Sequence, residues 1–373
     1  MKNLASLLAL LLISTATALA QRIVDLSGNG IPGVEIKCVV SCQQTAGPVA
    51  TATQVTTTDT EGRFSWPLPG PPGIGSGCQQ SVNYSYTLKK DGYIFTRSAF
   101  RYRPPSLAPG AYDDRLDLIQ GTNLPAWANV SAASFVTDQF IASEMILAGF
   151  GADLAARIEI ATELLTTTPA SRRVLVKDFV GVEKAAKLLF VSPGQINYVT
   201  PEGLANGPAQ IRLVDENDNL IRIGLAEIKT LAPAIFTANA DGKGVPAAVV
   251  VRVRPGNVQN YEPVAEFDQQ QQRFVPLALD LGPEDEFLVL SLFGTGWRRA
   301  SQTNMSVKVG GVDCSVEYVG KQPTIEGLDQ INARLPRALI GRGEVDVSVS
   351  FGSFPISIPS DYFVTNAVKL KFK

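Results

Sequence analysis

The chain contains no histidine. That absence excludes Ser-His-Asp and Cys-His catalysis, zinc sites that need histidine ligands, and pH sensing by an imidazole. An excess of positive charge is missing as well, because 33 Lys and Arg stand against 35 Asp and Glu, for a net charge of −2. Nucleic acids and anionic membranes attract proteins through concentrated Lys and Arg, so this charge balance favours neither partner.

What is present is the composition of a folded protein, with 45% hydrophobic and 18% charged residues in a chain of 373. Chains with that balance bury a core instead of staying disordered. At roughly 150 residues per domain, the length predicts two or three domains.

The first 20 residues have the pattern of a secretory signal peptide. Lys2 precedes a hydrophobic stretch at residues 4–13, and Ala18-Leu19-Ala20 forms a small-x-small cleavage site. The stretch is too short for a membrane-spanning helix, which needs ~20 apolar residues. We therefore predict Sec-type export, cleavage after Ala20, and a secreted, extracellular product that does not insert into a membrane.

An exported chain can keep disulfide bonds, and Cys38, Cys42 and Cys78 all lie in its first hundred residues. Cys38 and Cys42 cannot pair along one extended strand, because four residues span ~13 Å and a disulfide needs Cα atoms within ~7 Å. The preferred disulfide is Cys42 with Cys78, and Cys38 with Cys78 is the alternative. Cys314 is predicted to be an isolated thiol in a core.

Residues 21–119 alternate between apolar and polar side chains and are broken by Gly, Asp and Asn turns, which predicts a small β-sandwich. Three motifs carry a resemblance to the carboxypeptidase-regulatory family, which is transthyretin-like and Cna-B-like: Gly30-Ile31-Pro32-Gly33-Val34, residues 58–64 and residues 86–93. The resemblance implies a prealbumin-like sandwich that serves as a non-catalytic spacer or binding domain. Residues 120–129 are predicted to be a linker.

From residue 130 onward the informative feature is an internal repeat. Residues 144–151 match residues 286–294 with a one-residue offset, and Gln195-Ile196-Asn197 matches Gln330-Ile331-Asn332. A proline follows each Gln-x-Asn motif, and each copy then closes with a glycine and an alternating strand. A repeat of ordered motifs indicates two similar structural units. We place the first at residues 130–232 and the second, preceded by extra strands, at residues 233–373.

Residues 153–165 fit two structures. Leu154, Ile158, Ala161 and Leu165 form a helical stripe, but the alternation through Ile158 and Ile160 fits a strand equally well. The repeat favours the strand.

The motifs of residues 130–352 resemble the uncharacterised Solibacter-type C-terminal domain family of exported acidobacterial proteins. They include residues 130–135, 190–198, 232–239, 241–244, 293–296, 327–332 and 341–345. Each half is also similar to an IPT/TIG domain, most clearly at residues 307–317. The resemblance implies tandem immunoglobulin-like β-sandwiches and supplies no catalytic residues. The predicted fold class is therefore all-β: tandem immunoglobulin-like β-sandwiches after an N-terminal transthyretin-like sandwich.

The candidate site residues are the amides of the two Gln-x-Asn motifs: Gln195, Asn197, Gln330 and Asn332. In a strand, both amides of a motif lie on the face opposite its central Ile. They could bind a sugar or a peptide, but amides also satisfy backbone groups well. Since the pair recurs in both repeats, the favoured interpretation is structural: the amides tie neighbouring strands, or the two repeats, together.

Other polar groups give weaker signals. Residues 215–219 resemble the start of a calcium loop but lack its sixth-position glycine and twelfth-position glutamate, so a polar turn is favoured. The carboxylate pairs Asp113 with Asp114 and Glu284 with Glu286 could in principle serve a glycosidase. Tryptophans such as Trp127 and Trp297 are more often buried than used for sugar stacking. No catalytic residue, metal site or cofactor is predicted.

Taken together, the sequence predicts a secreted, non-catalytic protein that binds, adheres or displays something outside the cell. Its expected partner is an extracellular glycan or a surface protein, and not a nucleic acid. The alternatives are a polysaccharide hydrolase that uses Asp and Glu alone, and a structural spacer in a surface assembly.

Overall fold

The computed structural model describes residues 21–25, 29–42, 50–64, 82–95, 119–124, 127–136, 140–165, 171–352 and 363–373. The predicted signal peptide, residues 1–20, lies outside them. The chain divides into two compact units, residues 1–90 with 100–118 and residues 91–99 with 119–373. Strands dominate both, which confirms the all-β fold class. None of the helices within these ranges is long and apolar enough to span a membrane.

The first unit contains a three-stranded antiparallel sheet in the order β3-β2-β5, and its β1 pairs with β4 in an antiparallel arrangement. Its strands are β1 (Gln21–Asp25), β2 (Glu35–Cys42), β3 (Ala50–Thr57), β4 (Arg63–Phe64) and β5 (Val82–Lys89). Val34 and Ile36 are fully buried, as the alternation of this segment predicts. The buried hydroxyl of Thr58 accepts a hydrogen bond from Val34 N and donates one to Ile31 O.

The second unit begins with the short pair β6 (Ile94–Phe95) and β7 (Ile119–Thr122) and continues as two sandwiches. The first sandwich packs the sheet β10-β13-β14-β9-β8 against the sheet β12-β11-β15-β16. Its strands are β8 (Ala128–Ser131), β9 (Ile146–Phe150), β10 (Glu159–Leu165), β11 (Arg173–Lys177), β12 (Glu183–Ala185), β13 (Lys187–Val191), β14 (Gln195–Val199), β15 (Gly207–Val214) and β16 (Leu220–Ile228).

The segment that fitted both a helix and a strand contains a strand. Residues 159–165 form β10 and pair with β13, whereas residues 151–158 form turns. Leu154 is fully buried, but Ile158 and Ile160 are exposed. The apolar stripe therefore does not mark a helix face, and the interpretation favoured by the repeat is confirmed for residues 159–165.

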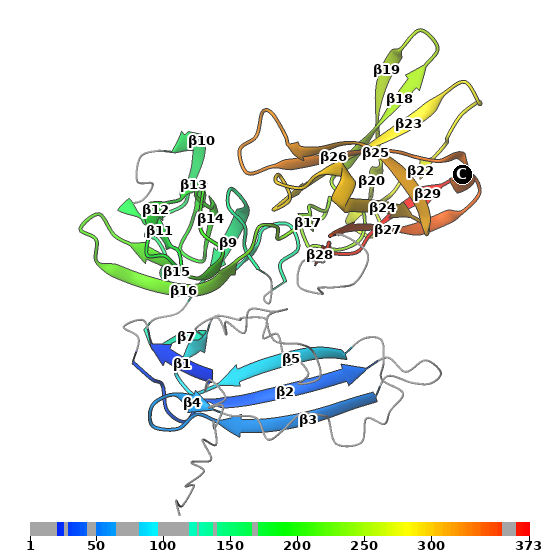
Figure 1. Ribbon diagram of the computed structural model, residues 1–373. Coiled ribbons are helices and arrows are strands. Elements are labelled where there is room, and N and C mark those ends of the chain that lie inside the picture. Colours follow the sequence, from blue (N-terminus) through cyan, green and yellow to red (C-terminus); the bar gives the residue numbers. More distant parts are fainter. Residues whose placement is uncertain are drawn as a thin grey trace, which may run out of the picture. The chain divides into compact units, whose positions relative to one another are not determined.

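The second sandwich is one continuous path of strands, β19-β18-β23-β26-β25-β24-β27-β29-β22, with β17 on β23 and β28 on β27 (Figure 1). β25 passes from one sheet to the other, because its first residues pair with β24 and its later ones with β26. The strands are β17 (Ala234–Ile235), β18 (Ala248–Arg254), β19 (Val258–Pro263), β20 (Ala265–Asp268), β21 (Arg273–Pro276), β22 (Ala278–Leu279), β23 (Phe287–Thr295), β24 (Met305–Val309), β25 (Val312–Lys321), β26 (Asp329–Arg334), β27 (Gly343–Phe351), β28 (Phe363–Val364) and β29 (Val368–Phe372), with the 3-10 turns η2 (Gln302–Asn304) and η3 (Arg337–Leu339).

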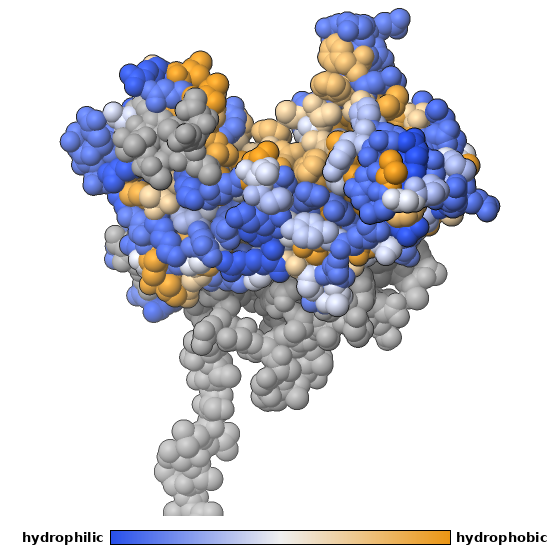
Figure 2. Space-filling view, turned by 90° about the horizontal axis from the view of Figure 1, so that it is seen from above, coloured by the Kyte–Doolittle hydropathy of each residue, from blue (hydrophilic) through white to orange (hydrophobic). Residues whose placement is uncertain are grey.

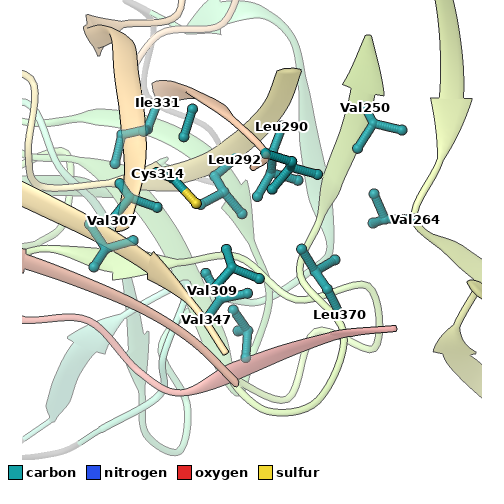
Figure 3. Packing of buried hydrophobic residues seen from close by; sticks show 14 of the residues in the cluster. Val250, Val264, Leu290, Leu292, Val307, Val309, Cys314, Ile331, Val347 and Leu370 are labelled. Carbon is teal, nitrogen blue, oxygen red and sulfur yellow. The ribbon is translucent and has the colours of Figure 1, made fainter. Parts of the chain in front are cut away.

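Alternate side chains of these strands meet in the core of the second sandwich. Leu290, Leu292 and Ile331 come from one sheet and face Val309 and Val347 of the other (Figure 3). Cys314 lies among them as a free, buried cysteine, as predicted, and burial raises the pKa of its thiol to about 11. Because every second residue is thus committed to the core, the intervening ones form the outer face on which the site lies.

Polar contacts join the two sandwiches. The buried hydroxyl of Thr295 accepts a hydrogen bond from Ile146 N at 2.9 Å and donates one to Gly327 O at 2.8 Å. Arg298, whose side chain is only 6% exposed, pairs with Glu144 of the first sandwich and with Asp329 of the second. The two sandwiches are therefore held together by specific bonds as well as by the chain that links them.

Candidate ligand-binding groove

The extra strands before the second repeat widen its sheet. β18 pairs with β23 along most of its length and carries β19 as an edge strand. The β18–β19 hairpin extends past the rest of this sandwich in Figure 1. Beside it, on the outer face of β18, β23 and β26, lies an open groove of about 520 Å³. That volume lies within the ~300–1,000 Å³ of typical ligand pockets.

The floor of the groove is apolar. It consists of side chains that alternate with the core residues of β18 and β23: Val249, Val251, Val253, Phe287, Val289 and Phe293. In the sheet, Val251 lies directly opposite Val289 and Val253 opposite Phe287, so the floor is continuous across the two strands. Along β23 the floor runs from Phe287 to Phe293, about 20 Å at the usual rise of a β-strand, and Ser291 is the polar residue on that line.

Two of the predicted site residues, Gln330 and Asn332, form part of the wall. Gln330 Nε2 donates a hydrogen bond to Asn332 Oδ1 at 2.8 Å, and Ser291 Oγ donates a second at 3.0 Å. Asn332 thus ties β26 to β23, as the structural interpretation predicts. Among the described residues, however, nothing bonds to Gln330 Oε1 or to Asn332 Nδ2. The wall therefore offers a ligand the carbonyl oxygen of Gln330 as an acceptor and the amino group of Asn332 as a donor.

The remaining polar side chains of the groove are also mostly amides. Asn257, Gln259 and Gln322 line it, together with the carboxylate of Glu317. Gln322 uses its oxygen to accept hydrogen bonds from Thr324 and Ile325, which leaves its amino group available. No Lys or Arg belongs to the lining, and the cation beside it, Arg334, lies at one end against the ring of Phe287.

Aromatic side chains flank the floor. Tyr261 of β19 lies opposite Val251 and is 74% exposed, an unusual state for an aromatic ring in a strand. At the end of the groove, the guanidinium of Arg334 lies 3.7 Å from the centre of the Phe287 ring. This cation–π contact fixes the orientation of the ring. On the face shown in Figure 2, hydrophobic residues form small groups among hydrophilic ones and do not merge into one large patch.

The hairpin is anchored from its other face. Arg252, which alternates with the valines of the floor, hydrogen-bonds to Glu262 of β19, to Glu286 and to Asp280 O. These bonds, above all the one with Glu262, raise the pKa of Arg252. The hydrogen-bonded network prearranges β19, and with it Tyr261, beside the groove.

The first repeat has the same amide pair, which does not line this groove. Gln195 Nε2 donates to Asn197 Oδ1 at 2.8 Å, which reproduces the bond of the second repeat. The cross-strand neighbours also correspond: Gln195 lies opposite Phe150 and Asn197 opposite Ala148, as Gln330 lies opposite Phe293 and Asn332 opposite Ser291. Within the described part of the chain, no hydrogen bond joins the two amide pairs. The contacts between the repeats include instead those of Thr295 and Arg298, the ion pair of Lys187 with Glu326 and the ring contact of Phe140 with Phe363.

Of the carboxylates considered for hydrolysis, Glu286 is held in ion pairs. Glu286 is paired with Arg252 and Arg254, and Asp113 and Asp114 lie outside the described residues. Asp215 accepts hydrogen bonds from Asn217 N, Asn219 N and the Asn219 side chain. That last bond is the main cause of the lowered pKa of this carboxyl. In the described ranges no cluster of Cys, Asp or Glu is arranged to hold a metal ion.

The predicted disulfide falls on residues of which the structure says little. Cys78 lies outside the described residues, and the same holds for the side chains of Cys38 and Cys42. Both pairings of Cys78 therefore stay predictions. Trp127 and Trp297 are buried, at 4% and 0% exposure, so neither is a surface stacking platform.

No protein-family model and no curated protein matches the chain. Among solved structures, one similar protein is SGBP-B of the Bacteroides ovatus mixed-linkage glucan utilization locus, in complex with a mixed-linkage heptasaccharide. It is 12% identical with a TM-score of 0.26, over 64% of this chain and 45% of that one. Another is the BSP domain of a biofilm-associated protein, 12% identical with a TM-score of 0.22, over 62% of this chain and 28% of that one.

The chain thus spans less than half the length of either protein. Because both the identity and the TM-score are low, the function proposed below rests on this chain's own residues.

Proposed function

We propose that the protein is a secreted, non-catalytic binding protein and that the groove beside the β18–β19 hairpin is its ligand-binding surface. The observation that carries the proposal is the composition of this groove. It has an apolar floor, an exposed tyrosine, and amide atoms, among them Gln330 Oε1 and Asn332 Nδ2, that have no hydrogen-bond partner among the described residues. Known ligand sites have a similar composition, with an apolar surface and a few polar groups that orient the ligand.

Export is part of the proposal and is supported by the signal-peptide pattern of residues 1–20. The motifs of residues 130–352 support a further proposal, that this region belongs with the Solibacter-type C-terminal domains of exported proteins. Binding without catalysis is supported by the lack of histidine and by the ion pairs that occupy Glu286.

A pull-down from native cell-envelope material, together with a glycan array, tests the binding function. We expect the purified chain to retain a ligand in at least one of the two assays, and Tyr261→Ala to retain much less. Val258→Ala is the matched control, because Val258 is an exposed residue of the same strand and is not part of the groove. If the wild-type chain retains nothing in either assay, the proposal is wrong.

A further inference from the structure

We infer that the ligand of this groove is a neutral glycan whose β-linked pyranose rings carry equatorial hydroxyls and form a flat ribbon. The inference rests on the function proposed above and names the chemical class of the ligand. Three features of the groove carry it: the shape and chemistry of the floor, the donor and acceptor groups of the walls, and the charge.

The floor matches the faces of such a sugar. A pyranose with equatorial substituents has C–H groups on both faces and directs its hydroxyls outward in the plane of the ring. Laid on the sheet, it buries one C–H face against half-buried side chains such as Val251 and Phe287, which removes apolar area from water. A flat ribbon of β-linked rings can continue this contact along the floor, whereas the axial linkages of an α-1,4 chain curl it away.

The walls match the edges of the sugar. A hydroxyl both donates and accepts hydrogen bonds, and a carboxamide offers an N–H donor and a C=O acceptor side by side. Gln330 and Asn332 line the groove from β26, and Gln330 Oε1 and Asn332 Nδ2 have no hydrogen-bond partner among the described residues. On the opposite side, Asn257 and Gln259 of the hairpin offer the same pair of functions. Amides on both sides therefore suit a ligand with hydroxyls on both edges.

The charge of the groove favours a neutral ligand. Its lining contains the carboxylate of Glu317 and no Lys or Arg, and Arg334 stands at one end, over the ring of Phe287. A chain of uronic acids or sulfated sugars would bring a negative charge towards Glu317 and repeat it along the groove, where one cation at the end cannot compensate each charge. Tyr261 lies beside the floor, where its exposed ring can stack on the C–H face of a sugar.

An extended peptide fits this surface less well. A peptide that adds to a sheet pairs its backbone with a free strand edge. The groove lies on a sheet face, where the backbones of β18 and β23 are already paired with their neighbours. A peptide laid there would keep its own backbone groups unpaired except where the few amides reach them.

Isothermal titration calorimetry of the full chain tests the inference with cellohexaose, maltohexaose and hexagalacturonate as probes. We expect binding of cellohexaose, at least tenfold weaker binding of maltohexaose, and none of hexagalacturonate. Tyr261→Ala should weaken cellohexaose binding about tenfold or more, because an exposed aromatic anchor contributes much of the energy of a binding site. The double variant Gln330→Ala with Asn332→Ala should weaken it by a similar factor.

The first repeat supplies the matched control. Gln195→Ala with Asn197→Ala removes the same hydrogen bond from the equivalent strand outside the groove, and should leave cellohexaose binding within twofold of the wild type. Thermal unfolding of each variant shows that it remains folded.

Failure of the inference and failure of the proposed function give different results. Preference for hexagalacturonate, or equal binding of maltohexaose, would overturn the inference. A third result would also overturn it: the chain retains envelope material, Tyr261→Ala abolishes that retention, and no neutral glycan binds. In that case the groove would still be a binding site, but for another class of ligand. If neither sugars nor envelope material are retained, both are wrong.

Discussion

At the scale of single residues, the strongest constraints lie where the two sandwiches meet. Asp329 is fully buried, accepts a hydrogen bond from Trp297 N at 2.8 Å and pairs with Arg298 at 3.0 Å. Arg298 also reaches Glu144 of the first sandwich at 2.8 Å. A buried charge is tolerated only while its partner is present, so these residues act as a unit.

Removing the cation of this unit should be costly. We expect Arg298→Met to lower the free energy of unfolding by about 3–5 kcal/mol, because Asp329 is left buried without its partner. Arg157→Met is the control: Arg157 pairs with Glu159 but is 73% exposed, and exposed pairs contribute only about 0–1 kcal/mol. Denaturant unfolding measures both, and equal losses would contradict this account of the junction.

Asp329 should also make stability depend on pH. Burial raises the pKa of its carboxyl from 3.8 to about 6, in spite of the nearby Arg298. The folded chain therefore holds a proton that the unfolded chain has already released between pH 4 and 6. The contribution of this group to stability is fully present below pH 3.8 and is lost as the pH rises through about 6. The loss is on the order of 3 kcal/mol.

Asp329→Asn tests this dependence, since an amide does not titrate. We expect the difference in unfolding free energy between wild type and variant to change between pH 4 and 6 and to be constant above pH 7. A difference that does not vary with pH would show that Asp329 keeps an ordinary pKa in the folded chain.

At the scale of strands, the sequence predicts the repeated elements well and the inserted ones poorly. Gln-Ile-Asn predicts a strand with a buried Ile, and Ile196 and Ile331 are both fully buried. The groove was not predictable, because it depends on which strand lies beside which. No local pattern states that Val251 lies between Val289 of β23 and Tyr261 of β19. The alternation in β18 predicts a strand but does not identify its neighbours.

The side chains of the Gln-x-Asn motifs are also only partly predictable from the sequence. Their position on the outer face follows from period-two alternation. The pair Gln330 and Asn332 lines the groove because the β18–β19 hairpin lies beside the second repeat, and the alternation of β26 does not reveal that neighbour. Equivalent residues in a repeat can therefore differ in function through their surroundings.

The hairpin should depend on Arg252. This side chain is 8% exposed and links β18 to Glu262 of β19 and to Glu286. We expect Arg252→Met to speed amide hydrogen exchange in β19 about tenfold or more, since the edge strand loses its charge-assisted bonds. Arg254→Met is the control, because Arg254 is 42% exposed and pairs with Glu286 at the rim. Unchanged exchange in β19 would show that the backbone ladder alone holds the hairpin.

At the scale of the whole molecule, the chain consists of β units, and its candidate site lies on an addition to one of them. The core residues of both sandwiches follow the alternation of their strands, and the junction fixes the second sandwich to the first through Thr295 and Arg298. Function is therefore expected to reside in surface groups of the inserted hairpin, while the repeated strands provide a rigid support.

The groove beside β18 and β19 is proposed to bind a ligand outside the cell. A binding isotherm of the purified chain on native cell-envelope material, compared with those of Tyr261→Ala and Val258→Ala, tests this directly. We expect saturable binding that Tyr261→Ala weakens about tenfold or more and that Val258→Ala leaves unchanged. Saturable binding with the same affinity in all three proteins would place the ligand elsewhere and contradict the claim.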